Sequence, residues 1–135
     1  MFKRIDHVEI VPTDAERTIN FYVDIIGFKI QSRNEINMPP MKEVIYLKLG
    51  DTVIEIMSID NPEPKSEAPW KVGYRALALE VEDMSKAVAY MESKKIPITW
   101  GPADLGEVLR AEIQDPDGLI IELRQWKKQS TQSLT

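Results

Sequence analysis

Histidine and glutamate side chains stand within strand-like runs of this sequence, where they could do chemistry. His7 is the only histidine of the chain, and period-2 alternation places it with Glu9 on one strand face, opposite Val8. Glu55 and Glu122 each stand between aliphatic neighbours. A buried carboxylate needs a cation, a proton or hydrogen-bond donors. These residues therefore indicate either a metal site or a set of ion pairs.

The residues themselves leave simpler interpretations open. One face of an antiparallel sheet is commonly solvated, so the mixed face that carries these side chains fits a wet surface as well as a cavity lining. A lone histidine in a strand is more often structural than a ligand. Glu55 and Glu122 could equally form partly exposed ion pairs with Arg110 or Arg124, which would contribute little stability.

The elements that position these residues follow from the sequence pattern. A strand is predicted over 5–11, and Thr13 with Glu16 forms a capping box that starts a helix. That helix is predicted to reach Ile26, with Gly27 as its C-cap residue. Further strands are predicted over 28–33, 44–49 and 52–59, the last two joined by a short Gly50-Asp51 hairpin.

The same order then repeats. Residues 60–73 contain three prolines and are predicted to be a linker. After a strand over 74–81, Asp83 caps a helix, and strands are predicted over 96–100, 107–114 and 119–126. Aligning the two halves places His7 over Ala76 and Glu55 over Glu122. The repeat predicts an α+β fold made of two βαβββ modules. Their apolar sheet faces pack on the two helices.

Domain boundaries follow from the repeat. We predict one domain over residues 1–126, with module one at 1–59, the linker at 60–73 and module two at 74–126. Residues 127–135 are predicted to be a polar tail.

Composition restricts the function classes. The net charge of −5, without a basic cluster, argues against a nucleic-acid partner. The absence of cysteine removes disulfides, thiolate metal sites and a cysteine nucleophile. Charges within Met1–Asp6 stand where a signal peptide would be apolar, and no run approaches the ~20 apolar residues of a membrane span. We expect a cytoplasmic protein without a membrane partner.

Several short motifs, in order, make the chain resemble the vicinal-oxygen-chelate family of glyoxalases, bleomycin-resistance proteins and dioxygenases. The resemblance covers about Phe2 to Trp126. It is carried by Asp6-His7-Val8, Arg17-Thr18-Ile19-Asn20-Phe21-Tyr22 with Ile26-Gly27-Phe28, Val53-Ile54-Glu55-Ile56, Arg75 to Asp83, and Asp115-Pro116-Asp117-Gly118 followed by Ile120-Ile121-Glu122-Leu123. It implies that the two modules form a curved, cup-like mixed sheet around a divalent metal, with the helices on the outer face.

The resemblance also implies a set of ligands. The family's ligand positions map onto His7, Glu55, Ala76 and Glu122, so His7, Glu55 and Glu122 are the expected metal ligands. Their imidazole and carboxylate groups suit Mn, Fe, Ni or Zn. Ala76 stands where such proteins usually carry a second histidine. Glu9, like Glu80, lies on the same face and could supply a replacement oxygen.

The implied function is that of a glyoxalase-like, metal-dependent lyase, isomerase or dioxygenase acting on a small substrate with neighbouring oxygens. Glu122 is the expected catalytic base, with Glu55 as the alternative. A metal-free protein that binds small molecules or antibiotics is the second hypothesis. It rests on Ala76 and on aromatic residues that could line an apolar pocket: Tyr46, Trp70, Tyr74 and Trp100. A structural or partner-binding domain is the third. The resemblance also implies a homodimer.

Overall fold

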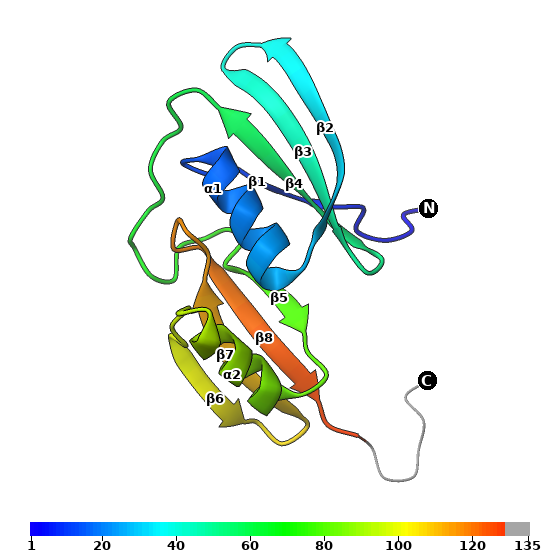
Figure 1. Ribbon diagram of the computed structural model, residues 1–135, viewed down its shortest axis with the longest axis vertical. Helices are drawn as coiled ribbons and strands as arrows, with labels where there is room; N and C mark the ends of the chain where they lie inside the picture. The colour runs from blue at the N-terminus through cyan, green and yellow to red at the C-terminus, as the bar shows by residue number, and fades with distance from the viewer. Residues whose placement is uncertain (129–135) are drawn as a thin grey trace. The chain divides into compact units, whose positions relative to one another are not determined.

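The computed structural model describes residues 1–128, in two compact units (Figure 1). The first unit spans Met1–Glu67 and the second begins at Ala68. Most of the predicted tail, residues 129–135, lies outside the described residues. The arrangement of one domain over residues 1–126 stays a prediction. No helix among residues 1–128 is long and apolar enough to cross a membrane.

The first unit is a βαβββ module. Its strands form a four-stranded sheet in the order β1-β4-β3-β2, in which β1 pairs parallel with β4 and the other pairs are antiparallel. Helix α1 packs against β4, and a π-helical turn, η1, continues it. The elements are β1 (Val8–Ile10), α1 (Ala15–Asn20), η1 (Phe21–Ile26), β2 (Lys29–Met38), β3 (Met41–Leu49) and β4 (Thr52–Ile59).

The second unit repeats this plan. Its sheet has the order β5-β8-β7-β6, with β5 parallel to β8, and helix α2 packs against β8. The elements are β5 (Ala76–Glu80), α2 (Met84–Ser93), β6 (Trp100–Asp104), β7 (Val108–Gln114) and β8 (Ile120–Trp126). The predicted α+β fold of two βαβββ modules is confirmed. The closure of the sheets into a cup stays a prediction.

The helix boundaries agree with the sequence signals, with one correction. Asp14, not Thr13, is the N-cap of α1, because its carboxylate accepts the backbone N–H of Arg17. Gly27 ends the helical segment with φ +106°, a left-handed conformation that favours glycine. Asp83 caps α2 by accepting the N–H of Lys86, as predicted.

Several strand predictions were wrong in their bounds. The strands predicted over 28–33 and 44–49 are longer, Lys29–Met38 and Met41–Leu49, because they pair with each other as far as Met38 and Met41.

The first strand is shorter than predicted, since only Val8–Ile10 pairs with β4. Val8 pairs with Ile54, and β4 begins only two residues earlier, at Thr52, so little of β4 is left for the residues before Val8. The strand predicted over 96–100 instead begins at Trp100. The N–H of Ile96 is bound to the carbonyl of Met91 and closes the end of α2, so the chain cannot join the sheet there.

Each sheet has one uniformly apolar face, as the alternation predicts. In the first unit this face carries Ile45, Leu47, Ile54 and Ile56, all nearly inaccessible to solvent. In the second unit it carries Ala111, Ile113, Ile121 and Leu123. Burial of these side chains supplies the main stabilisation of each unit. The opposite faces carry the charged residues.

Candidate functional site

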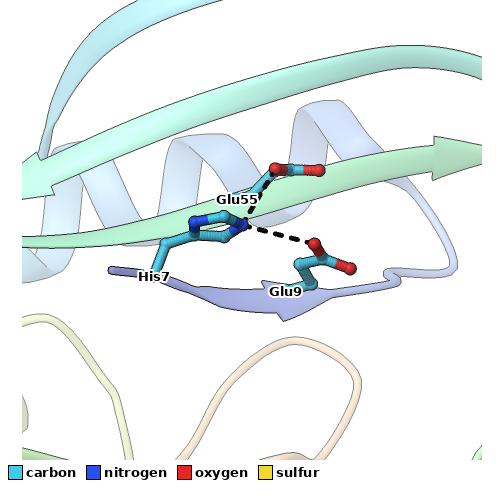
Figure 2. Close-up of side chains that lie close together, drawn as sticks. All are labelled: His7, Glu9 and Glu55. Atoms are coloured by element: carbon cyan, nitrogen blue, oxygen red, sulfur yellow. Dashed lines mark hydrogen bonds and ion pairs between the residues drawn. The ribbon is translucent and has the colours of Figure 1, made fainter. Parts of the chain in front are cut away.

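The candidate site lies on the charged face of the first sheet. Its ladder aligns Glu9 of β1, Glu55 of β4 and Tyr46 of β3 in one row across three neighbouring strands. His7 lies immediately before β1, two residues from Glu9, and points to the same face (Figure 2). The hairpin between β3 and β4 and the parallel pairing of β1 thus bring residues from distant parts of the unit together.

Both ring nitrogens of His7 contact carboxylate groups. Its Nδ1 lies 2.8 Å from Oδ2 of Asp6. Its Nε2 lies 3.3 Å from Oε2 of Glu9 and 3.3 Å from Oε1 of Glu55 (Figure 2). The Glu55 side chain is only 6% exposed, against 24% for His7 and 55% for Glu9. The imidazole therefore bridges a buried carboxylate and a solvent-accessible one.

The electrostatics of the cluster favour a charged imidazole at His7. The hydrogen bond to Asp6, followed by that to Glu9, raises the pKa of His7 above its usual value. The Tyr46 ring meets the His7 ring edge to face, with centroids 5.7 Å apart. Its hydroxyl is hydrogen-bonded to Glu55, and this bond raises the pKa of Tyr46. Glu55 thus has hydrogen-bonding partners despite its burial.

The same groups have the composition and spacing of a metal site. His7, Glu9 and Glu55 each offer one nitrogen or oxygen atom, and these atoms lie within 4.8 Å of one another. Metal bonds of about 2.0–2.2 Å place neighbouring ligand atoms about 3 Å apart. The 3.3 Å contacts of His7 Nε2 are close to that spacing. One imidazole and two carboxylates suit Zn, Mn, Fe or Ni, so the residues fit a divalent ion.

The structure brings His7 and Glu55 together, whereas Glu122 belongs to the other unit. Glu122 is bound there by two arginines: Arg110 Nε lies 3.0 Å from its Oε1, and Arg124 Nη1 lies 3.0 Å from the same oxygen. Ala76 pairs with Ile120 on β8 and offers no ligand atom. The role of Glu122 as a third ligand stays a prediction.

Equivalent rungs of the two ladders support the internal repeat. Glu9 pairs with Glu55 in the first sheet, and Ala78 pairs with Glu122 at the matching rung of the second. The sequence alignment predicted this correspondence. The second half thus lacks both the counterpart of His7, at Ala76, and the counterpart of Glu9.

Two residues of the cluster, Tyr46 and Asp6, were not predicted as partners of the candidate ligands. Tyr46 was considered only as a pocket-lining aromatic, although the Gly50-Asp51 hairpin fixes it opposite Glu55 and could have revealed it. Asp6 precedes the strand and was not considered as a partner of His7. A carboxylate next to a candidate histidine ligand is the signal that would have identified it.

Comparisons with known proteins agree with this fold. The family model for the Glyoxalase/Bleomycin resistance protein/Dioxygenase superfamily matches residues 4–123. The uncharacterized protein YaeR of Escherichia coli (strain K12) is 33% identical over 122 residues, 90% of this chain and 95% of that protein. The mitochondrial methylmalonyl-CoA epimerase of Mus musculus is 27% identical and spans 90% of this chain and 72% of the epimerase.

A solved structure has the same arrangement of elements. The crystal structure of a glyoxalase family protein from Enterococcus faecalis matches with a TM-score of 0.78 at 31% identity, covering 91% of this chain and 98% of that one.

Proposed function

The chain belongs to the Glyoxalase/Bleomycin resistance protein/Dioxygenase superfamily, and from this premise we propose that it is a metal-dependent lyase or isomerase acting on a small substrate with neighbouring oxygens. The observation that carries the proposal is the contact of His7 Nε2 with two carboxylates, one of them the buried Glu55. In this proposal His7 and Glu55 hold the metal, and Glu9 takes the place of the ligand missing at Ala76.

The chemistry follows from the donor set. A bound divalent ion would supply Lewis acidity toward the neighbouring substrate oxygens. Asp6 fixes the orientation of His7 through Nδ1, which leaves Nε2 directed toward Glu9 and Glu55. Such support of a metal-binding histidine by a carboxylate holds the ring in place. The Tyr46 hydroxyl holds Glu55 in the same way.

Two carboxylates are proposed for proton transfer. Glu122 is the base that the family resemblance implies, and Glu55 is the alternative. Glu122 is held by Arg110 and Arg124 in the second unit. This pairing favours a carboxylate of fixed orientation. Glu122→Gln tests the first assignment in a turnover assay: loss of turnover with metal content retained supports Glu122 as the base, whereas retained turnover leaves Glu55.

One observation favours a second candidate function. Ala76 leaves an expected ligand position apolar, and the His7 imidazole already has carboxylate partners at both nitrogens. A metal-free protein that binds a small molecule or an antibiotic would keep the same framework. In that case His7 and Glu55 form an ion pair that stabilises the first unit.

Metal content distinguishes the two functions. Protein purified without chelators, then loaded with Mn, Fe, Ni or Zn, should hold close to one ion per chain by elemental analysis. His7→Ala and Glu55→Gln should lose most of it. Glu43→Gln removes another carboxylate of the first unit, one that pairs with Arg33, and should retain the metal.

The opposite result would refute the metalloenzyme proposal. A folded wild-type chain that holds no metal after loading would leave the binding protein as the function. Metal retained by both His7→Ala and Glu55→Gln would show that the ion binds elsewhere.

The homodimer and the cytoplasmic location are likewise proposals, since they rest on the family resemblance and on the sequence. Light scattering during size-exclusion chromatography measures the mass of the particle directly. A single species at twice the 15.5 kDa chain mass would support the dimer, and a monomer at micromolar concentration would contradict it.

A further inference from the structure

The charged face of the second sheet carries a chain of alternating charges whose three arginines have no part in the proposed metal site. Arg75 contacts Glu112 at 3.4 Å, and Arg110 contacts the same carboxylate at 2.6 Å. Arg110 also contacts Glu122, which is bound in turn by Arg124, each at 3.0 Å. We call these five linked residues the arginine network. It begins and ends with an arginine, so its formal charge is +1 within a chain of net charge −5.

The two end arginines of this network, Arg75 and Arg124, are more exposed to solvent than its glutamates. The side chains of Glu112 and Glu122 are 10% and 12% exposed, whereas those of Arg75 and Arg124 are 42% and 33% exposed. Three guanidinium groups offer roughly fifteen N–H donors, against roughly eight acceptor sites on two carboxylates. The network therefore presents an excess of donors to an incoming anion.

All three tryptophans of the chain lie on these arginines. Arg75 lies 5.2 Å from the ring centroid of Trp70, while Arg110 lies 4.8 Å from Trp100. Arg124 lies 4.9 Å from Trp126. The three tryptophan residues are 84%, 43% and 50% exposed, in the order Trp70, Trp100, Trp126. Exposed tryptophan is costly to solvate and is typical of binding surfaces. Flat apolar surface thus borders the cationic groups.

The first unit provides a contrast. Its Arg33 also joins two carboxylates, those of Glu16 and Glu43. There one guanidinium serves two acids, so the group carries net negative charge, and no tryptophan of the described residues stacks on it. The ion pairs of the second unit therefore differ from those around Arg33, because they contain more arginines than acids and tryptophan rings lie on the arginines.

We propose that the arginine network and its three tryptophans form a binding site for a small aromatic carboxylate. The carboxylate group would accept hydrogen bonds from the guanidinium groups in the planar, two-pronged geometry that arginine favours. The ring would lie against indole surface. If the proposed enzymatic function holds, this ligand is the substrate or its carboxylate-bearing part; the anion site itself does not depend on that function.

A neighbouring acidic residue, Glu80, provides a control whose removal should have the opposite effect on binding. Glu80 on β5 pairs in register with Arg124 on β8, so it lies on the same face. It is exposed, and its negative charge opposes an incoming anion. Removing that charge should strengthen binding, whereas removing an arginine should weaken it.

The test is a titration of metal-free protein, stripped with a chelator that is then removed, followed through the indole N–H signals of the three tryptophans by NMR. Benzoate should shift these signals and bind about tenfold more tightly than benzamide, its neutral analogue, because hydrogen bonds to a charged acceptor are stronger. Benzoate should also bind more tightly than inorganic phosphate, which has no ring.

Variants identify the residues responsible. Arg124→Gln and Arg75→Gln should each weaken benzoate binding about tenfold, and both sites are exposed enough for the unit to stay folded. Glu80→Gln should strengthen it severalfold, and Arg33→Gln should leave it unchanged.

Three results would overturn the inference: equal binding of benzoate and benzamide, equal weakening by Arg33→Gln and Arg124→Gln, or binding that appears only after metal is restored. The last result would place the anion on the metal and would leave the proposed function intact. Benzoate binding to a chain that takes up no metal would support the anion site while refuting the metalloenzyme.

Discussion

Replacing Arg110 with methionine should destabilise the second unit by about 2–3 kcal/mol at neutral pH. The guanidinium of Arg110 lies between Glu112 and Glu122, at 2.6 Å and 3.0 Å from their carboxylates. Methionine keeps most of the length of the side chain and removes the charge together with the N–H donors. Glu112 and Glu122 then remain as two largely buried carboxylates with no positive charge between them.

The magnitude follows from the ladder. Glu112 and Glu122 are directly paired across β7 and β8, which places their Cβ atoms about 5 Å apart. Two unit charges at about 5 Å repel by about 3 kcal/mol when the effective dielectric constant is about 20. Arg75 and Arg124 still contact one carboxylate each and offset part of this repulsion.

Urea denaturation followed by tryptophan fluorescence measures the effect in the second unit, because all three tryptophans belong to it. The double variant Arg110→Met with Glu112→Gln should recover stability because it removes one of the two repelling charges. A loss below about 0.5 kcal/mol at pH 7, typical of an exposed ion pair, would refute the reasoning.

Three further predictions concern the framework. Asp83→Ala removes the N-cap of α2 and should lower the free energy of unfolding by about 1 kcal/mol in urea denaturation, whereas Asp83→Asn should be nearly neutral. Ile121→Ala empties a site of 0% exposure and should cost about 3 kcal/mol by the same measurement; a loss under 1 kcal/mol would show that the core repacks. Arg33 lowers the pKa of Glu43 from its ordinary 4.5, so the stability that Glu43 provides is present above that pH and is lost as the pH falls through the lowered folded pKa. Glu43→Gln should therefore be less stable than wild type by under about 1 kcal/mol at pH 7 and equal to it in the acid range, which thermal melts across pH can check.

Local signals predicted most of the fold. Gly27 and Asp83 mark helix ends through backbone and capping chemistry that involves only neighbouring residues, and the structure confirms both. The first N-cap was misplaced by one residue because Thr13 and Asp14 are both competent caps. The prediction started β6 too early because the apolar residues before Trp100 fit a strand. In the structure a hydrogen bond from the N–H of Ile96 to the carbonyl of Met91 ties these residues to α2 instead.

The sequence predicted which strand face the site residues occupy, because side chains alternate between the two faces of a strand. That rule placed His7 and Glu55 on charged strand faces. Which residues oppose each other across strands depends on register, and the parallel pairing that sets Glu9 beside Glu55 has no local signature in the sequence. The antiparallel hairpin is different, since its tight turn fixes the register and so places Tyr46 opposite Glu55.

The alternating charges of the second sheet also restrict how the sequence can change over evolutionary time. Arg110 contacts two carboxylates and Glu122 contacts two guanidinium groups. A single neutral replacement at either position therefore leaves two charged partners without one of their ion pairs. Pairs of compensating substitutions avoid that intermediate. Positions 110 and 122 should therefore covary among close relatives, either as an arginine with a glutamate or as two apolar residues, with few lineages that keep only one charge.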